Sequence, residues 1–197
     1  PVWLRWTPTR TTDRPVGYLM PPSMASVVPI LLDHDIAVYD FLEPAAFDAE
    51  VYYATDVRTD SYFQGHYLKS VDVEKERERI DVVPGWFWVP TAQSRGNLIT
   101  YLMEPETDDN LITWGWTDHV LQETPESVAE VMEAMLGDTD PASLTAEQRT
   151  AVEARAREIM QERQRVPMMR VMTHQNLPVI RVQQPNRYQR NRFANDQ

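Results

Sequence analysis

The fold is decided by residues 86–116, which read WFWVPTAQSRGNLITYLMEPETDDNLITWGW. Runs rich in aromatic and β-branched residues, 86–90 and 98–103, come before an acidic segment, and a further apolar run follows it. Aromatic and β-branched residues favour strands, whereas Pro, Asp and Asn favour turns. The stretch therefore predicts strands around an acidic hairpin turn, in which Pro105 constrains the first position and Asn110 tolerates a positive φ.

The same strand pattern extends toward the N-terminus. Further β-prone runs lie at residues 51–53, 62–73 and 79–83, and Asp, Pro and Gly separate them. Residues 75–79 alternate in charge, which predicts a solvated hairpin tip. This spacing indicates an antiparallel, sandwich-like sheet.

A smaller unit precedes this sheet. Residues 16–20 and 36–41 have strand character, and a short helical stretch between them ends near His34. Residues 1–13 lack periodicity and are predicted to be extended.

Two helices follow the sheet. Thr124 and Pro125 open the first helix, and Gly137 closes it. Thr145 and Gln148 have the spacing of a capping box at the start of the second. Beyond these helices, residues 167–182 predict one or two short strands.

We therefore expect an α+β protein with a small strand-helix-strand unit, an antiparallel β-sandwich-like sheet, two helices and an extended C-terminal arm. The expected parts are an extended lead-in (1–13), a β-rich domain (14–120), a two-helix segment (121–165) and a basic extended tail (166–197).

Composition limits the classes of function. The chain has 197 residues, a formal net charge of -11 and no cysteine, so it can bury a core without disulfides. An acidic body repels phosphate, which argues against nucleic acid as a partner. No apolar run reaches the roughly 18 residues of a membrane span. The basic tail is predicted to dock on acidic surface of this chain or another copy through Arg181, Arg187, Arg190 and Arg192.

Motifs for catalysis are missing from the sequence. None of the four histidines, His34, His66, His119 and His174, is followed three residues later by the Glu of an H-x-x-E zinc motif. No Gly-x-Ser-x-Gly elbow and no glycine-rich phosphate loop is present. A triad assembled from distant residues stays open, because sequence spacing does not reveal it.

Four carboxylates gather at Glu104, Glu106, Asp108 and Asp109. Calcium prefers several such oxygen ligands, which makes this segment a candidate calcium turn. The alternating Asp spacing of a calcium loop is absent, so we favour a hairpin turn whose acids lie in water.

Four tryptophans form two i, i+2 pairs, Trp86 with Trp88 and Trp114 with Trp116. On a strand each pair projects to one face, where it could stack sugar rings. We favour burial in a Trp-rich core or in a subunit interface over sugar stacking, with the interface ahead of the core for at least one pair.

Several motifs occur in an order that resembles a known family. They are RPVGYLMP (14–21), LLDHDIAV (31–38), QGH (64–66) and YLMEPETDDNLITW (101–114). Together they resemble the region that follows the catalytic domain in bacterial zinc carboxypeptidases, the carboxypeptidase A-like metallopeptidases. Asp35 and Asn110 stand where that family has glycine, and both residue types tolerate left-handed backbone.

The resemblance covers residues 14–119. It implies a non-catalytic C-terminal accessory or assembly domain of a secreted or periplasmic protein, with no cofactor in this chain and zinc in the upstream part of the parent protein. The partners it implies are an upstream catalytic half or homologous subunits, with self-association. Two alternatives remain: an extracellular glycan-binding module that uses the Trp pairs, and the second half of an active metallocarboxypeptidase.

Overall fold

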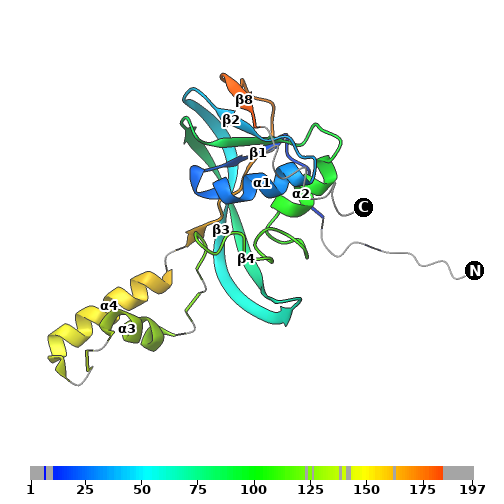
Figure 1. Cartoon of the computed structure of the whole chain (residues 1–197). Helices are drawn as coiled ribbons and strands as arrows, with labels where there is room; N and C mark the ends of the chain where they lie inside the picture. Colours follow the sequence, from blue (N-terminus) through cyan, green and yellow to red (C-terminus); the bar gives the residue numbers. More distant parts are fainter. Residues whose placement is uncertain are drawn as a thin grey trace, which may run out of the picture.

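The computed structural model describes residue 7 and residues 11–183, except residues 123, 126, 138, 141, 142 and 162. In this part of the chain the protein is α+β, as predicted, with one antiparallel sheet that does not close (Figure 1). The strands are β1 (Gly17–Met20), β2 (Tyr39–Phe41), β3 (Ala45–Phe63), β4 (His66–Val82), β5 (Phe87–Pro90), β6 (Gln164–Arg165), β7 (Met169–Val171) and β8 (Ile180–Val182). The helices are η1 (Pro22–Val27), α1 (Val28–Asp33), α2 (Gly96–Met103), α3 (Val128–Leu136) and α4 (Ala146–Gln161).

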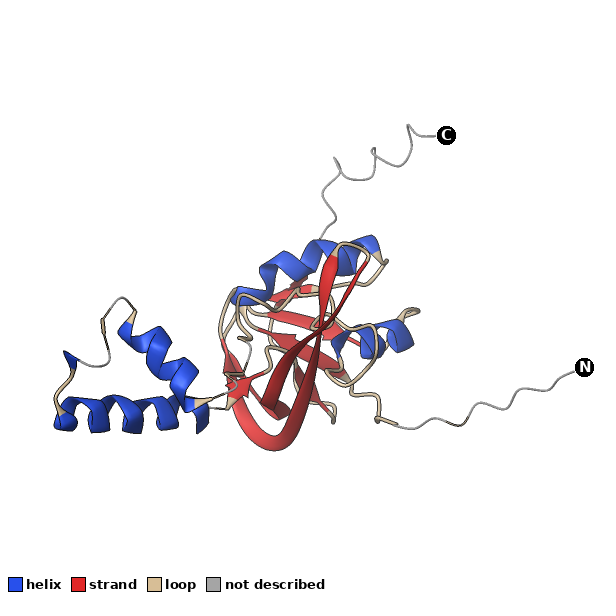
Figure 2. Cartoon of the chain, turned by 90° about the horizontal axis from the view of Figure 1, so that it is seen from below, coloured by secondary structure: helices blue, strands red, loops and turns tan. Residues whose placement is uncertain are grey.

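The long hairpin of β3 and β4 dominates the sheet (Figure 2). Its turn lies at Gln64 and Gly65, whose φ angles of 47° and 89° are left-handed. The predicted tip at residues 75–79 is wrong, because this segment lies within β4 and pairs with β3. Alternating charges are typical of an edge strand, where they discourage pairing with another chain.

The remaining strands complete the order β4-β3-β7-β1-β5-β2-β8, and β6 pairs with β3. The predicted strand-helix-strand unit is present as β1, η1 with α1, and β2, and its two strands flank β5 in the same sheet. Both short strands predicted in the tail form. One of them, β7, lies between β3 and β1 in the middle of the sheet.

Two apolar cores lie on opposite faces of the sheet, because neighbouring residues of a strand point to opposite faces. The helix-side core combines strand residues with η1, α1 and α2, and includes Tyr18, Met20, Met24, Leu31, Tyr52, Phe87, Ile99 and Met103. The strand-side core comes from strands alone and contains Leu19, Phe41, Phe47, Ala49, Val51, Ile80, Val82, Trp88, Met169 and Val171.

The sheet curls around the strand-side core. Phe41 of β2 lies 5.6 Å from Phe47 of β3, measured between ring centroids, although three strands separate β2 from β3 in the sheet order. Phe47 also stacks on Trp88, at 6.2 Å and 13° between ring planes. This curvature gives the antiparallel sheet its sandwich-like form.

The strand predicted at residues 98–103 is wrong: this segment forms α2. Leu98 and Leu102, and also Ile99 and Met103, repeat at a spacing of four, which places each pair on one side of a helix. Ile99 and Met103 are fully buried against the sheet. The run that follows, 111–120, consists of turns.

The two predicted helices form, but the predicted start of the first is wrong: α3 begins at Val128 and not at Thr124 and Pro125. The Thr124 amide and hydroxyl are instead hydrogen-bonded to the backbone of Val57 on β3. The Ser127 hydroxyl caps α3 by accepting from the Glu130 amide, and Gly137 ends it with φ of 53°. Thr145 and Gln148 form the predicted capping box, with reciprocal hydrogen bonds of 3.2 and 2.9 Å. Both views show α3 and α4 side by side and set apart from the sheet (Figures 1 and 2). No helix among the described residues is long and apolar enough to cross a membrane.

Candidate functional site

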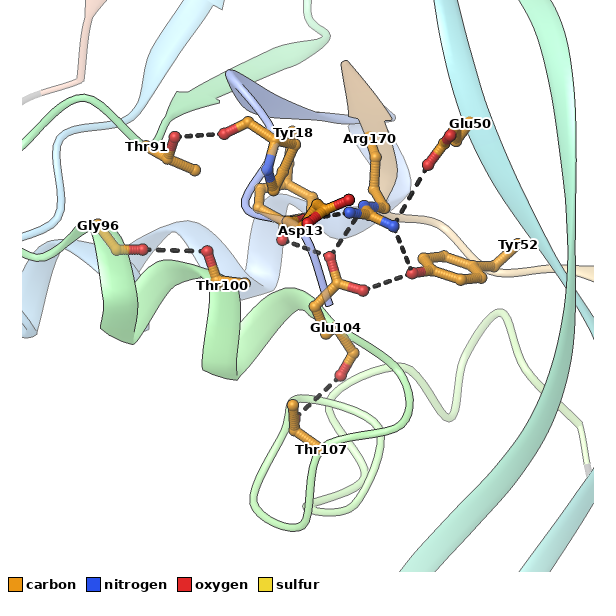
Figure 3. A network of polar contacts seen from close by, with 11 residues as sticks. Asp13, Tyr18, Glu50, Tyr52, Thr91, Gly96, Thr100, Glu104, Thr107 and Arg170 are labelled. Atoms are coloured by element: carbon orange, nitrogen blue, oxygen red, sulfur yellow. Dashed lines mark hydrogen bonds and ion pairs between the residues drawn. The ribbon is translucent and has the colours of Figure 1, made fainter. Parts of the chain in front are cut away.

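The acidic segment begins with a buried carboxylate. Glu104 directly follows α2, and only 3% of its surface is exposed. The hydroxyl of Tyr18 on β1 donates to Glu104 Oε1 at 2.6 Å, and the hydroxyl of Tyr52 on β3 donates to Oε2 at 2.5 Å (Figure 3). One carboxylate thus joins a helix to two strands that are not neighbours in the sheet.

Arg170 of β7 supplies the positive charge beside this carboxylate. Its Nε lies 3.1 Å from Glu104 Oε1, an ion-pair distance without the alignment of a hydrogen bond. Its Nη1 donates to the Tyr52 hydroxyl at 3.1 Å and lies 3.3 Å from Glu50 Oε2. Its Nη2 donates to the backbone carbonyl of Asp13 (Figure 3). We call Tyr18, Glu50, Tyr52, Glu104 and Arg170 the buried ionic network.

Protonation in this network follows from burial and charge. Burial raises the pKa of Tyr18 and of Tyr52 well above the usual range, and the adjacent Glu104 carboxylate raises it further. Both phenols therefore keep their protons. Burial lowers the pKa of Arg170, but the attraction of Glu104 and its other neighbours outweighs this effect and raises it. The network therefore holds two neutral donors and a permanent cation around Glu104.

The prediction that all four acids of the segment lie in water is wrong for Glu104. Glu106, Asp108 and Asp109 are exposed, and Asp109 Oδ1 accepts a 2.6 Å hydrogen bond from the Trp114 indole. Among the described residues, no three His, Cys, Asp or Glu side chains are arranged to hold a metal ion.

Asn110 organises the rest of this segment. Its buried amide donates to the carbonyls of Pro105 and Thr107, at 3.0 and 2.6 Å, and accepts from the amides of Ile112 and Thr113, at 2.8 and 2.9 Å. The positive φ predicted for Asn110 is wrong, since Asp35 and Gln64 are the non-glycine residues with positive φ in the described chain. Asn110 acts through its side chain instead.

The structure separates the two tryptophan pairs. Trp88 is buried in the strand-side core, and Trp86 packs partly buried against it, so this pair follows the core interpretation. Trp114 and Trp116 lie in turns rather than on a strand, and 43% of Trp116 is exposed.

Trp114 belongs to a second polar site, beside the β3-β4 turn. Its ring centroid lies 5.7 Å from that of His66, edge to face at 80°. Together with Tyr67, Lys69 and Asp118 they line an open cavity of about 540 Å³. Local sequence patterns do not reveal this cavity, because its walls are the hairpin turn and the turns after Asn110, two segments far apart in the chain.

The predicted docking arm is described only at its first arginine. Arg181 of β8 lies 3.1 Å from the largely buried Asp40 of β2, so it pairs with the acidic body of its own chain. Arg187, Arg190 and Arg192 lie outside the described residues.

Arg170, Tyr18 and Tyr52 were not among the site residues predicted from the sequence. One signal for Arg170 was available: it is a single charge inside the apolar run 166–172, and a charge in such a run requires a buried partner. Neither Tyr18 nor Tyr52 carries a comparable signal.

Comparisons with protein-family models, curated proteins and solved structures find no match for this chain.

Proposed function

We propose that this chain is a non-catalytic accessory and assembly domain of an exported zinc-carboxypeptidase-like protein. The observation that carries the proposal concerns residues 101–114, the most specific part of the resemblance. The buried polar residues of this segment, Glu104 and Asn110, form their hydrogen bonds with other groups of the same chain. Such residues hold a scaffold together and leave no carboxylate oxygen of Glu104 for a substrate.

A second observation supports attachment to an upstream part. Arg170 donates to the carbonyl of Asp13, the last residue of the lead-in, which precedes the first strand. The backbone entering the domain is thus tied to the buried ionic network. In the proposed parent protein this contact would hold the accessory domain at a fixed position behind a zinc-bearing catalytic half in the extracellular or periplasmic space.

Self-association is part of the same proposal. The α3-α4 pair buries Val131 and Ala156, yet Met135 of α3 keeps 42% of its surface exposed. Two helices bury little apolar area by themselves, which favours association with another subunit. The basic tail after Arg181 differs in charge sign from the acidic body, and attraction between them would add a salt-sensitive component.

The test uses the purified chain in two assays. We expect no release of C-terminal amino acids from peptides, with or without a zinc chelator, and no retained transition metal after dialysis. Sedimentation equilibrium is expected to show oligomers that dissociate as salt rises from about 0.05 to about 0.5 M. One tightly held transition ion per chain, together with unaided peptide cleavage, would refute the proposal. Activity that appears only on adding an upstream half would instead favour the split-enzyme alternative.

A further inference from the structure

We propose that the cavity beside the β3-β4 turn binds an uncharged sugar ring. This inference goes beyond the accessory role and does not depend on it. It differs from the glycan hypothesis based on two tryptophan pairs, because Trp86 and Trp88 belong to the core. We call the cavity lined by His66, Tyr67, Lys69, Trp114 and Asp118 the tip cavity.

Aromatic side chains are part of the lining of the tip cavity. Trp114 is held by its indole bond to Asp109 and by the edge-on ring of His66. Tyr67 keeps 65% of its surface exposed and contacts Tyr62 across the hairpin, with ring centroids 4.9 Å apart. Exposed aromatic rings on a turn gain nothing from the core, but they offer flat apolar surface to the C–H face of a pyranose.

The charged groups that line the cavity form a pair without net charge. Lys69 Nζ lies 3.0 Å from Asp118 Oδ1, and these are the one lysine and the one carboxylate among the residues that line the cavity. Lys69 is held in place, since its side chain is only 14% exposed. A paired ammonium and carboxylate offer donors and acceptors to hydroxyl groups, while they give little attraction to an anion or a polycation.

The backbone also fixes the two walls of the cavity. The Lys69 amide donates to the Thr113 carbonyl at 3.0 Å and so joins β4 to the turns after Asn110. Gly115 has a φ of 74°, and a Cβ there would lie 3.0 Å from Asp118 Oδ2. The absence of a side chain at Gly115 therefore lets this turn approach Asp118 closely.

The volume and the surroundings select this cavity over its neighbour. About 540 Å³ lies within the range of small-ligand sites, roughly 300–1,000 Å³. The adjacent cavity of about 470 Å³ has no aromatic side chain, and its lining includes four carboxylates and two cations: Asp60, Asp72, Glu106, Asp108, Arg58 and Lys69. Uncharged hydroxyls combined with an apolar face match the tip cavity, and carbohydrates have both.

The experiment measures binding of three neutral oligosaccharides to the full chain: cellohexaose, chitohexaose and maltohexaose. Calorimetry and tryptophan fluorescence are the readouts. We expect at least one of them to bind and to change the fluorescence. Tyr67→Ala is expected to weaken binding about tenfold, whereas Tyr67→Phe, which keeps the ring, stays close to wild type.

A matched control separates the cavity from general effects. Tyr101 is an exposed tyrosine on α2 outside the tip cavity, so Tyr101→Ala is expected to bind like the wild type. Cooperative thermal unfolding of Tyr67→Ala, with no more than the small loss expected from its contact with Tyr62, would show that the fold is intact. The proposal is overturned if no neutral oligosaccharide binds, if Tyr67→Ala binds as tightly as wild type, or if only oligogalacturonate or a proline-rich peptide binds.

Discussion

The two halves of the β3-β4 hairpin differ in what surrounds them. From Ala45 to Val57, the residues of β3 are buried or half-buried except for Asp48 and Thr55, and β7 and β6 pair with this part. From Arg58 to Phe63 every residue is exposed, and the rings of Tyr62 and Phe63 reach solvent. The same hairpin thus has a base that packs into the fold and a tip whose side chains are exposed to solvent. Substitutions in the two halves are expected to have different consequences.

The largest effect is expected in the buried ionic network at the base. Arg170→Met leaves Glu104 buried without its cation, and loss of one partner from such a pair costs about 3–5 kcal/mol. We expect the free energy of unfolding, measured in urea, to fall by this amount. The matched control is Arg58→Met in the tip half, where ion pairs with Asp56 and Asp72 are solvent-exposed. Equal urea midpoints for both variants would contradict the division of the hairpin.

The second effect is on the pH dependence of stability. Folding raises the pKa of Tyr18 and Tyr52, so above a pH of about 10 the unfolded chain releases these protons while the folded chain keeps them. The stabilisation is complete below that pH and is lost as the pH rises, by up to about 1.4 kcal/mol per pH unit for each phenol.

Urea unfolding between about pH 8 and pH 11 measures this slope. The double variant Tyr18→Phe, Tyr52→Phe lacks both titrating hydroxyl groups, so its free energy of unfolding is expected to fall less steeply as the pH rises. A wild type and a double variant with parallel pH profiles would argue against protonated donors in the buried ionic network.

A third, intermediate effect is expected at Gly17 of β1. A Cβ at this position would lie 2.4 Å from the ring of Trp88, which is itself packed in the strand-side core. Gly17→Ala is expected to destabilise by about 1–3 kcal/mol through overpacking. The double variant Gly17→Ala, Trp88→Leu is expected to show a coupling between the sites, because the smaller side chain gives room for the methyl group. Additive losses in thermal unfolding would speak against this contact.

The smallest effect is expected at the tip. Tyr62 and Tyr67 form a cross-strand aromatic pair, and such pairs contribute about 0.2–1 kcal/mol. Tyr62→Ala should therefore lower the unfolding free energy by less than about 1 kcal/mol. A double-mutant cycle with Tyr67→Ala isolates the pair. A loss as large as that of Arg170→Met would mean that the tip supports the fold.

Local patterns predicted those parts of the fold that depend on neighbours in sequence. The α+β class, α3 with its Gly137 end and the Thr145-Gln148 box are confirmed, because caps and helical periodicity act over a few residues. Residues 98–103 misled the strand prediction. Their Ile, Thr and Tyr favour strands, but burial of Ile99 and Met103 one helical turn apart outweighs that preference.

The buried ionic network could not be predicted in the same way. Glu104 and its neighbour Glu106 have the same chemistry, and only the approach of β1, β3 and β7 decides which of the two is buried. These strands come from residues about 50 to 90 positions away on either side of Glu104. Local sequence rules do not reach such distances. The tip cavity could not be predicted for the same reason, since its walls meet only after folding.

The central position of β7 determines when the middle of the sheet can form during synthesis of the chain. Strands β1 and β3 are synthesised early, but each presents an unpaired edge until residues 169–171 leave the ribosome and fill the gap between them. Open edges of this kind attract other chains, and Glu104 lacks its guanidinium partner during the same interval. The addition of β7 therefore joins the two parts of the sheet and brings Arg170 to Glu104 in the same step.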